Sequence, residues 1–255
     1  MIKVIRKKKE GNLKFLNILY KLIQKILRQI IPPILSYRKF KEIINYFLRE
    51  KNQIHLEESY FKRHAFINKA ISKYTNCNYL EIGVADNDVF NSIPLKLKNK
   101  YGVDPVCGGN YRLTSDDFFE KYKHIKFDVI FIDGLHHYIQ CQKDAINSIN
   151  SLNKNGIIFF HDMLPKNSFE EFVPRKQAEW TGDVWKVAVE LTNSNNCEFK
   201  IINIDYGIGV LKINDNFEYK KMPELKNKRY DTFLEYYSKF NIINSEEALD
   251  FIKFN

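Results

Sequence analysis

The stretch FDVIFIDGLHHY, residues 127–138, carries the clearest fold signal in this chain of 255 residues. Its residues 129–132 are a continuous apolar run, which is typical of a strand buried on both faces of a sheet. Three ionisable side chains follow closely, namely Asp133, His136 and His137. Because ligands bind beyond the carboxyl ends of the strands in open parallel sheets, we expect a binding or catalytic site at this strand end.

Apolar runs of the same kind flank this stretch at intervals that suit alternating strands and helices. We predict further strands at residues 78–84, 100–105 and 155–162. Residues 137–154 lie between two of the predicted strands and carry one apolar stripe at helical spacing, which indicates a βαβ unit. Such a unit predicts a parallel sheet with helices on both faces.

The predicted sheet ends in an antiparallel pair. Helices are expected at residues 51–77 and 182–193, and apolar runs follow at residues 197–205 and 208–214. The link between these two runs is too short for a crossover helix, so the two strands must pair as a hairpin. The predicted fold class is therefore α/β, with a Rossmann-like, mostly parallel sheet and an antiparallel final strand.

The basic charge of the chain is concentrated in an N-terminal arm. Of the 40 Lys and Arg and the 31 Asp and Glu residues, 13 and 3 respectively lie in residues 1–50, so the remainder is close to neutral. A domain that binds DNA or RNA is expected to carry a basic face, so we predict no nucleic-acid partner. We divide the chain into this helical arm, a core at residues 51–215 and a C-terminal helical extension at residues 216–255.

Residues 12–31 of the arm predict a basic amphipathic helix that ends before Pro32 and Pro33. Charges interrupt its apolar residues too often for a transmembrane span or a signal peptide. The helix could pack on its own domain or on a second copy in a homo-oligomer, or it could lie on an anionic membrane surface. The four scattered cysteines favour the cytoplasm, and the membrane alternative would place the protein at the inner membrane face.

Acidic residues stand at the carboxyl end of each predicted parallel strand. They are Glu81, Asp104, Asp133 and Asp162. A carboxylate after the second strand can bind the hydroxyls of a ribose, which nicotinamide dinucleotides and S-adenosylmethionine both contain. A dinucleotide site also needs a GxGxxG loop, whereas this chain has Gly83 followed by V-A-D-N-D. Two aspartates would repel a pyrophosphate, and they suit a cofactor with a cationic sulfonium better.

Seven motifs follow one another along residues 78–213: YLEIGV, GVDP, TSDDFF, FDVIFIDGLHHY, NGIIFFHDMLP, TGDVWK and DYGIGVLK. Together they resemble the class I S-adenosylmethionine-dependent methyltransferases, and most of all a bacterial branch with an IDGxHxY signature. One departure lies in the first loop, where Asn87 stands in place of a second glycine. Because Asn tolerates a left-handed backbone, we expect the turn to form.

The resemblance implies a role for each cofactor-binding residue. Glu81 and Gly83 would hold the methionine end of the cofactor, and Asp104 would hold its ribose. Asp116 would lie near the adenine. Asp133 would face the cofactor and the acceptor.

The histidines after the third and fourth predicted strands are candidates for the chemistry. A methyl transfer to a hydroxyl needs a base, and His136 matches the family's histidine, with His161 as the second candidate. His137 falls at a variable position and is expected to be an ordinary helix-terminal residue. Relatives can bind Mg²⁺ here, which implies a divalent-cation site at Asp133, His161 and Asp162, although His161 replaces a carboxylate of the relatives.

The predicted function is O-methylation by S-adenosylmethionine, with Asp133, His136 and His161 as catalytic residues. The family implies as acceptor a sugar hydroxyl of a bacterial surface polysaccharide or of its nucleotide-sugar precursor. Trp180 and Trp185 could stack on such a sugar or pack in the core. Two alternatives are a non-catalytic methyltransferase-fold protein tethered to a membrane or partner, and a nucleotide-cofactor oxidoreductase, against which the missing GxGxxG argues.

Overall fold

The computed structural model describes residues 54–253. The predicted basic arm, including its amphipathic helix, lies outside the described residues. Within residues 54–253, no helix is both long enough and apolar enough to cross a membrane.

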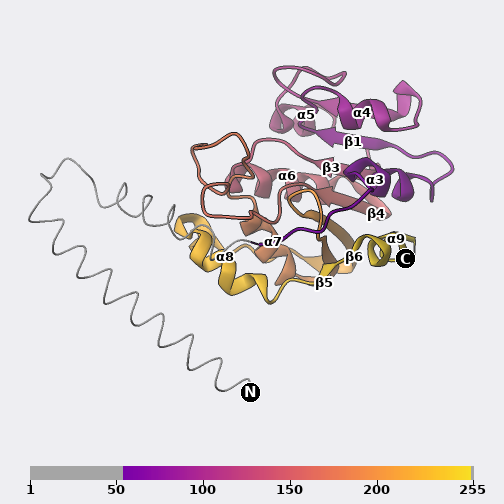
Figure 1. Cartoon of the computed structure of the whole chain (residues 1–255). Helices are drawn as coiled ribbons and strands as arrows, with labels where there is room; N and C mark the ends of the chain where they lie inside the picture. Colours follow the sequence, from indigo (N-terminus) through magenta and orange to yellow (C-terminus); the bar gives the residue numbers. More distant parts are fainter. Residues whose placement is uncertain (1–53, 254–255) are drawn as a thin grey trace, which may run out of the picture. The chain divides into compact units, whose positions relative to one another are not determined.

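A seven-stranded sheet forms the centre of the described part of the chain (Figure 1). Across the sheet, the strands follow the order β2-β1-β3-β4-β6-β5-β7. Their bounds are Tyr79–Ile82 for β1, Lys100–Val103 for β2, Phe127–Ile132 for β3, Leu152–Phe160 for β4, Asn195–Ile202 for β5, Ile208–Glu218 for β6 and Ile242–Ile243 for β7. Neighbouring strands run parallel except at β6, which is antiparallel to both β4 and β5. This topology confirms the predicted Rossmann-like, mostly parallel sheet.

The sheet differs from the prediction at the edge that follows β5. The antiparallel strand β6 is inserted between β4 and β5, and the short strand β7 pairs with β5 on its other side. β7 lies in the region that was predicted as a helical extension. It consists of Ile242 and Ile243 alone, which is too short to give an alternating pattern in the sequence.

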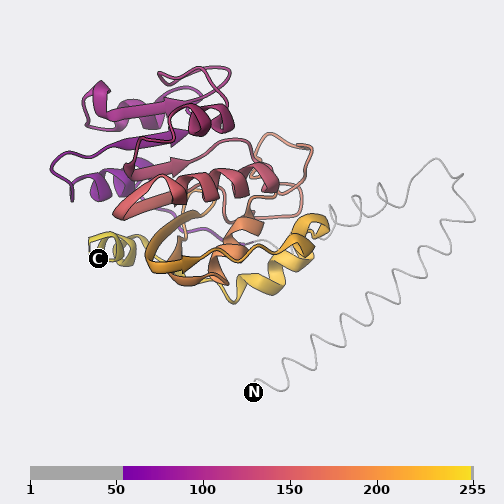
Figure 2. The same cartoon turned by 180° about the vertical axis from the view of Figure 1, so that it is seen from behind.

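Helices cover both faces of the sheet, as predicted. Their bounds are Arg63–Ile71 for α3, Asp88–Ser92 for α4, Ser115–Lys121 for α5, Tyr138–Asn150 for α6, Trp185–Thr192 for α7, Tyr230–Tyr237 for α8 and Ser245–Lys253 for α9, with short 3₁₀ helices at Leu97–Asn99 and Pro223–Asn227. Figure 1 looks onto the face that carries α3 and α9, and Figure 2 looks onto the face that carries α6.

The side chains of β3 show why residues 129–132 are all apolar. Ile130 and Ile132 join the core beneath α6, whereas Val129 and Phe131 join the core beneath α3, and all four are buried. Each such side chain contributes roughly 1.5–3 kcal/mol when it leaves water. This packing on both faces fixes the position at which the strand ends, and therefore the position of Asp133.

The helix predicted at residues 51–77 is shorter in the structure. Residues 54–62 form no regular secondary structure, and α3 begins at Arg63. The backbone N–H of Ile54 donates to Lys166 O at 3.1 Å, and that of Glu57 donates to Asn203 O at 2.8 Å. This extended segment therefore bonds to distant parts of the chain instead of to its own preceding turn.

Candidate active site at the carboxyl ends of the strands

A cleft with a volume of about 1030 Å³ opens at the carboxyl ends of β1, β3 and β4. Its walls include Gly83 after β1, Asp133 and His136 after β3, and His161 and Asp162 after β4. The predicted site residues at these three strand ends therefore share one cleft. This is the expected place for a ligand in a parallel sheet.

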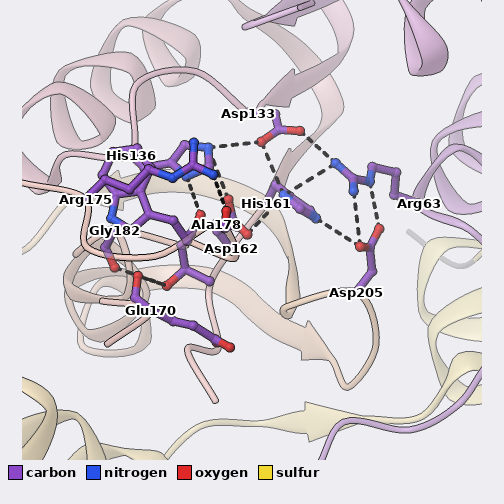
Figure 3. A network of polar contacts seen from close by, with 12 residues as sticks. Arg63, Asp133, His136, His161, Asp162, Glu170, Arg175, Ala178, Gly182 and Asp205 are labelled. Atoms are coloured by element: carbon purple, nitrogen blue, oxygen red, sulfur yellow. Dashed lines mark hydrogen bonds and ion pairs between the residues drawn. The ribbon is translucent and has the colours of Figure 1, made fainter. Parts of the chain in front are cut away.

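The ring of His136 is held by the segment that precedes α7. Its Nδ1 lies 2.9 Å from the backbone oxygen of Trp180, and its ring stacks on the Trp180 indole with centroids 4.9 Å apart. A carbonyl oxygen can only accept, so Nδ1 carries the proton and Nε2 is the nitrogen left for chemistry. Nε2 lies 3.2 Å from Asp162 Oδ2 and 3.7 Å from Asp133 Oδ1 (Figure 3).

Opposing effects set the pKa of His136. Burial lowers it, because a charged ring loses its hydration, whereas the hydrogen bond and charge of Asp133 and the charge of Asp162 raise it. The carboxylates outweigh the burial, so the pKa of His136 lies above its ordinary value. Once neutral, such a nitrogen binds a proton more strongly than a free imidazole does, which suits a general base.

Asp162 is held in a strained position after β4. Its φ is +64°, in the left-handed region that few residues other than glycine adopt. The side chain is buried, and its Oδ2 has no hydrogen-bond partner within residues 54–253, although it faces His136. Backbone strain and an unsatisfied buried oxygen at one residue are features that cluster at functional sites.

His161 is surrounded by carboxylates. Its Nδ1 lies 3.2 Å from Asp133 Oδ1 and 3.3 Å from Asp162 Oδ1, and its Nε2 lies 3.5 Å from Asp205 Oδ1. Burial lowers the pKa of His161, but the charges of Asp133 and Asp162 raise it well above its ordinary value. A ring with so high a pKa would keep its proton near neutral pH, and a protonated ring can neither remove a proton nor bind a cation. The roles of His161 as second base and metal ligand stay predictions.

Asp133 connects the two histidines to a cation that the sequence did not indicate. Its Oδ2 accepts a hydrogen bond from Arg63 Nη1 at 2.8 Å, and its Oδ1 faces His161 and His136 (Figure 3). Burial raises the pKa of Asp133, but His161, His136 and Arg63 together hold it well below its usual range. Asp133 is therefore ionised at any pH of interest.

Arg63 and Asp205 are site residues that the sequence reasoning missed. Arg63 donates to both Asp205 oxygens, from Nε at 2.7 Å and from Nη2 at 3.1 Å. Burial raises the pKa of Asp205, but His161 and Arg63 lower it to about 2. Asp205 could have been found, because it ends the predicted run 197–205. It was missed because acidic residues were considered only at the carboxyl ends of the predicted parallel strands.

The loop after β1 has the geometry that the sequence predicted. Gly83 has a φ of +84°, and a Cβ at this position would lie 2.1 Å from the backbone oxygen of Asp133, so no larger residue fits. Asn87 adopts the left-handed backbone with a φ of 70°. Glu81 lines the cleft and accepts a hydrogen bond from the Tyr79 hydroxyl at 2.7 Å, and burial raises the pKa of Glu81 to about 8.

Asp104 is not among the described residues that line this cleft. Its Oδ2 accepts from the backbone N–H of Ala85 at 3.1 Å, and its Oδ1 accepts from Val106 at 2.8 Å and Cys107 at 2.9 Å. Burial raises the pKa of Asp104, but these backbone hydrogen bonds outweigh the burial and bring the pKa below its ordinary value. Both oxygens that were assigned to a ribose thus hold the chain's own loops together.

Asp116 and His137 also lie apart from the cleft-lining residues. Asp116 pairs with Lys143 Nζ at 3.0 Å, accepts from Gln140 Nε2 at 3.2 Å, and lines a separate surface depression. His137 is the residue directly before α6, in the N-cap position. This agrees with the expectation that His137 is an ordinary helix-terminal residue.

The two tryptophans have different roles. Trp185 is fully buried, and its Nε1 donates to Glu171 Oε2 at 2.9 Å, so it packs in the core. Trp180 lines the cleft, but its ring stacks on His136 and lies 5.9 Å from the guanidinium carbon of Arg175. The Trp180 indole therefore supports the candidate base instead of offering an open face to a sugar.

The residues around Asp133 also decide whether the site can hold the divalent cation that the resemblance implied. Asp133, His136 and Asp162 each offer a ligand atom within 4.8 Å of the other two. However, Mg²⁺ prefers an octahedral set of oxygen ligands, and Arg63 and the ring of His161 already pair with the carboxylates. The donor set therefore does not fit a Mg²⁺ site.

Residues 65–163 match the family model described as a methyltransferase domain. None of the curated proteins matches the sequence. Among solved structures, a Staphylococcus aureus protein provisionally described as a caffeoyl-CoA O-methyltransferase is 14% identical over 76% of this chain and 98% of its own, with a TM-score of 0.46. A Bacillus cereus O-methyltransferase in complex with SAH is 10% identical over 75% and 96%, with a TM-score of 0.43.

A third structure is the O-methyltransferase TomG from Streptomyces achromogenes, involved in tomaymycin synthesis and in complex with SAM. It is 10% identical over 68% of this chain and 88% of its own, with a TM-score of 0.43. Similarities at these scores carry no conclusion about function. The family match coincides with the part of the sheet that holds the cleft, from α3 to the end of β4. Residues 65–163 of the chain are therefore similar to a methyltransferase domain, and they form the first four strands of its Rossmann-like sheet.

Proposed function

We propose that this protein is an S-adenosylmethionine-dependent methyltransferase that acts on a hydroxyl group, and that His136 is the general base. S-adenosylmethionine would supply the methyl group from its sulfonium, which would become a neutral thioether as the acceptor oxygen gains the methyl carbon. Nε2 of His136 would take up the hydroxyl proton. The observation that carries this proposal is the orientation of His136 in the cleft wall, where its Nδ1 is bound to the Trp180 carbonyl while its Nε2 faces the carboxylates of Asp162 and Asp133.

The cofactor is proposed to lie against the loop after β1. Gly83 allows close approach of a ligand to the backbone, and Glu81 and Asp133 line the cleft beside it. A carboxylate near the sulfonium would stabilise its positive charge. Ribose binding by Asp104 stays a prediction, and Oδ2, which accepts from the backbone N–H of Ala85, can accept a further hydrogen bond. The placement of Asp116 near the adenine likewise stays a prediction.

The charge of the cleft bears on the acceptor. The described residues that line it include seven acidic residues besides Glu81, whose pKa is raised to about 8, against Lys62 and Arg63 as permanent cations. A diphosphate would be repelled by this surface, whereas a neutral polyol would not. We therefore favour a sugar hydroxyl of a surface polysaccharide over that of a nucleotide-sugar precursor. Work in the cytoplasm at the inner membrane face, with the arm at residues 12–31 as membrane contact or homo-oligomer interface, stays a proposal.

Two measurements test this function. Isothermal titration should detect binding of S-adenosylmethionine to the full chain, and the absence of binding at high micromolar cofactor would contradict the proposal. A screen of glycans and sugar nucleotides with cofactor carrying a labelled methyl group should then find label on a glycan. His136→Gln should bind the cofactor normally and lose about 10²–10⁴-fold in turnover, the usual contribution of a general base.

A further inference from the structure

We propose that the Arg63 guanidinium is the resident cation of this site and takes the place of a divalent metal ion. Three carboxylates, those of Asp133, Asp162 and Asp205, converge on the cleft wall around His161. Arg63 contacts two of them with three donors, at 2.7, 2.8 and 3.1 Å. The role of Arg63 in methyl transfer rests on the proposed function. Its replacement of a metal ion among the carboxylates does not.

The arrangement of donors around Arg63 explains how it could exclude a metal ion. A guanidinium is planar and always charged, so its fork matches the two oxygens of Asp205 and cannot be neutralised by a shift in pH. Its Nη1 occupies Oδ2 of Asp133 and lies 3.5 Å from Nδ1 of His161. A dication bound to Asp133 would therefore lie close to a fixed positive charge, and like charges repel strongly where water is largely excluded.

The burial of the cluster supports a built-in role for Arg63. Asp133 and Asp205 keep roughly a fifth to a quarter of their side chains exposed, at 17% and 26%, and the side chain of Arg63 keeps 27%. Partly buried charges need compensation, because their hydration is incomplete. Arg63 provides that compensation from α3, and both Arg63 and its partner Asp205 lie outside the matched domain at residues 65–163.

The test begins with the full chain freed of metals by a chelator. It is then titrated with Mn²⁺, and the free ion is measured by electron paramagnetic resonance. Wild type should bind Mn²⁺ weakly, with a dissociation constant above roughly 1 mM, because Arg63 repels the ion. Arg63→Gln should bind one Mn²⁺ at least about tenfold more tightly. Adding Asp162→Asn to Arg63→Gln should remove this gain, because a ligand oxygen is lost.

Lys62→Gln is the matched control, since Lys62 also lines the cleft but forms none of the ion pairs of the cluster. It should bind Mn²⁺ as wild type does. Micromolar binding of Mn²⁺ by the wild-type chain would overturn the inference without any variant, and so would a folded Arg63→Gln whose affinity equals that of wild type. Because cofactor binding is measured separately, failure of the proposed function is distinguishable: the cofactor would not bind, whatever the Mn²⁺ result.

Discussion

The pKa of His136 should fall when Asp162 is replaced by Asn. Asp162 Oδ2 lies 3.2 Å from His136 Nε2, and its charge helps to raise the pKa of His136. Asn has nearly the same shape as Asp and tolerates a left-handed backbone, so the φ of +64° at this position can be kept. Asp162→Asn therefore removes a charge while leaving the local geometry in place.

The size of the change follows from the geometry around Nε2. An opposite charge at this range typically moves a pKa by about 1–3 pH units. Asp133 remains 3.7 Å from the same nitrogen in the variant, so we expect the lower end, a decrease of about one pH unit in the pKa of His136. This corresponds to about 1.4 kcal/mol of interaction between the two protonation states.

The lower pKa of His136 in Asp162→Asn should also change how the free energy of unfolding depends on pH. The folded pKa of His136 is raised above its unfolded value. Its contribution to the free energy of unfolding is therefore fully present below the unfolded value of about 6.5, and it is lost as the pH rises through the raised folded pKa. In Asp162→Asn, the part of the stability that disappears over this window should be smaller by about 1.4 kcal/mol.

The assay is a nuclear magnetic resonance titration of histidine rings labelled at Cε1, which needs no substrate. The chain has six histidines, and His136→Gln identifies the signal of His136. Asp205→Asn is the control, because Asp205 contacts His161 and Arg63 but forms no ion pair with His136. If His136 in Asp162→Asn titrates within about 0.3 pH units of wild type, the carboxylate does not set its pKa and the reasoning is refuted.

Three further predictions concern the loop after β1, the support of the base and the core. Gly83→Ala should abolish binding of S-adenosylmethionine by titration and destabilise the fold by more than about 2 kcal/mol, since its Cβ would lie 2.1 Å from a backbone oxygen. Trp180→Ala should broaden or shift the ring nitrogen resonances of His136, because the stacked indole is lost; unchanged resonances would contradict the positioning role. Glu190→Ala should lower the free energy of unfolding by about 3–5 kcal/mol in urea denaturation, because four groups donate to this buried carboxylate.

The strands and the rim of the sheet were predictable from the sequence for a simple reason. A strand covered on both faces carries a continuous apolar run, as β3 does at residues 129–132, and the carboxyl ends of parallel strands meet at one edge. Asp133, His136, His161 and Asp162 could therefore be assigned to a shared cleft without coordinates. Gly83 could be assigned too, because a glycine directly after the first strand marks close backbone approach.

Other features depend on contacts that no local pattern records. Arg63 reaches Asp133 because the extended segment before α3 bonds to Lys166 and Asn203, which are distant in the chain. Asp104 was assigned to a ligand, but whether a strand-end carboxylate binds a ligand or its own backbone depends on how the next loop folds. Here Val106 and Cys107 turn back and donate to it. The raised pKa of His161 likewise follows from Asp133 and Asp162, which tertiary packing brings next to its ring.

The paired carboxylates have a consequence for the proposed reaction, in which positive charge moves from the sulfonium sulfur to His136. Carboxylates without partners would stabilise the sulfonium before the reaction and would lose that stabilisation as its charge disappears, which raises the barrier. Arg63 and His161 reduce this effect by compensating Asp133 and Asp205. Asp162 Oδ2 faces His136, whose ring becomes positively charged in the proposed reaction. A fixed negative charge placed where positive charge develops favours the transition state over the ground state, so the asymmetric pairing of the cluster suits methyl transfer better than an unpaired acidic cleft would.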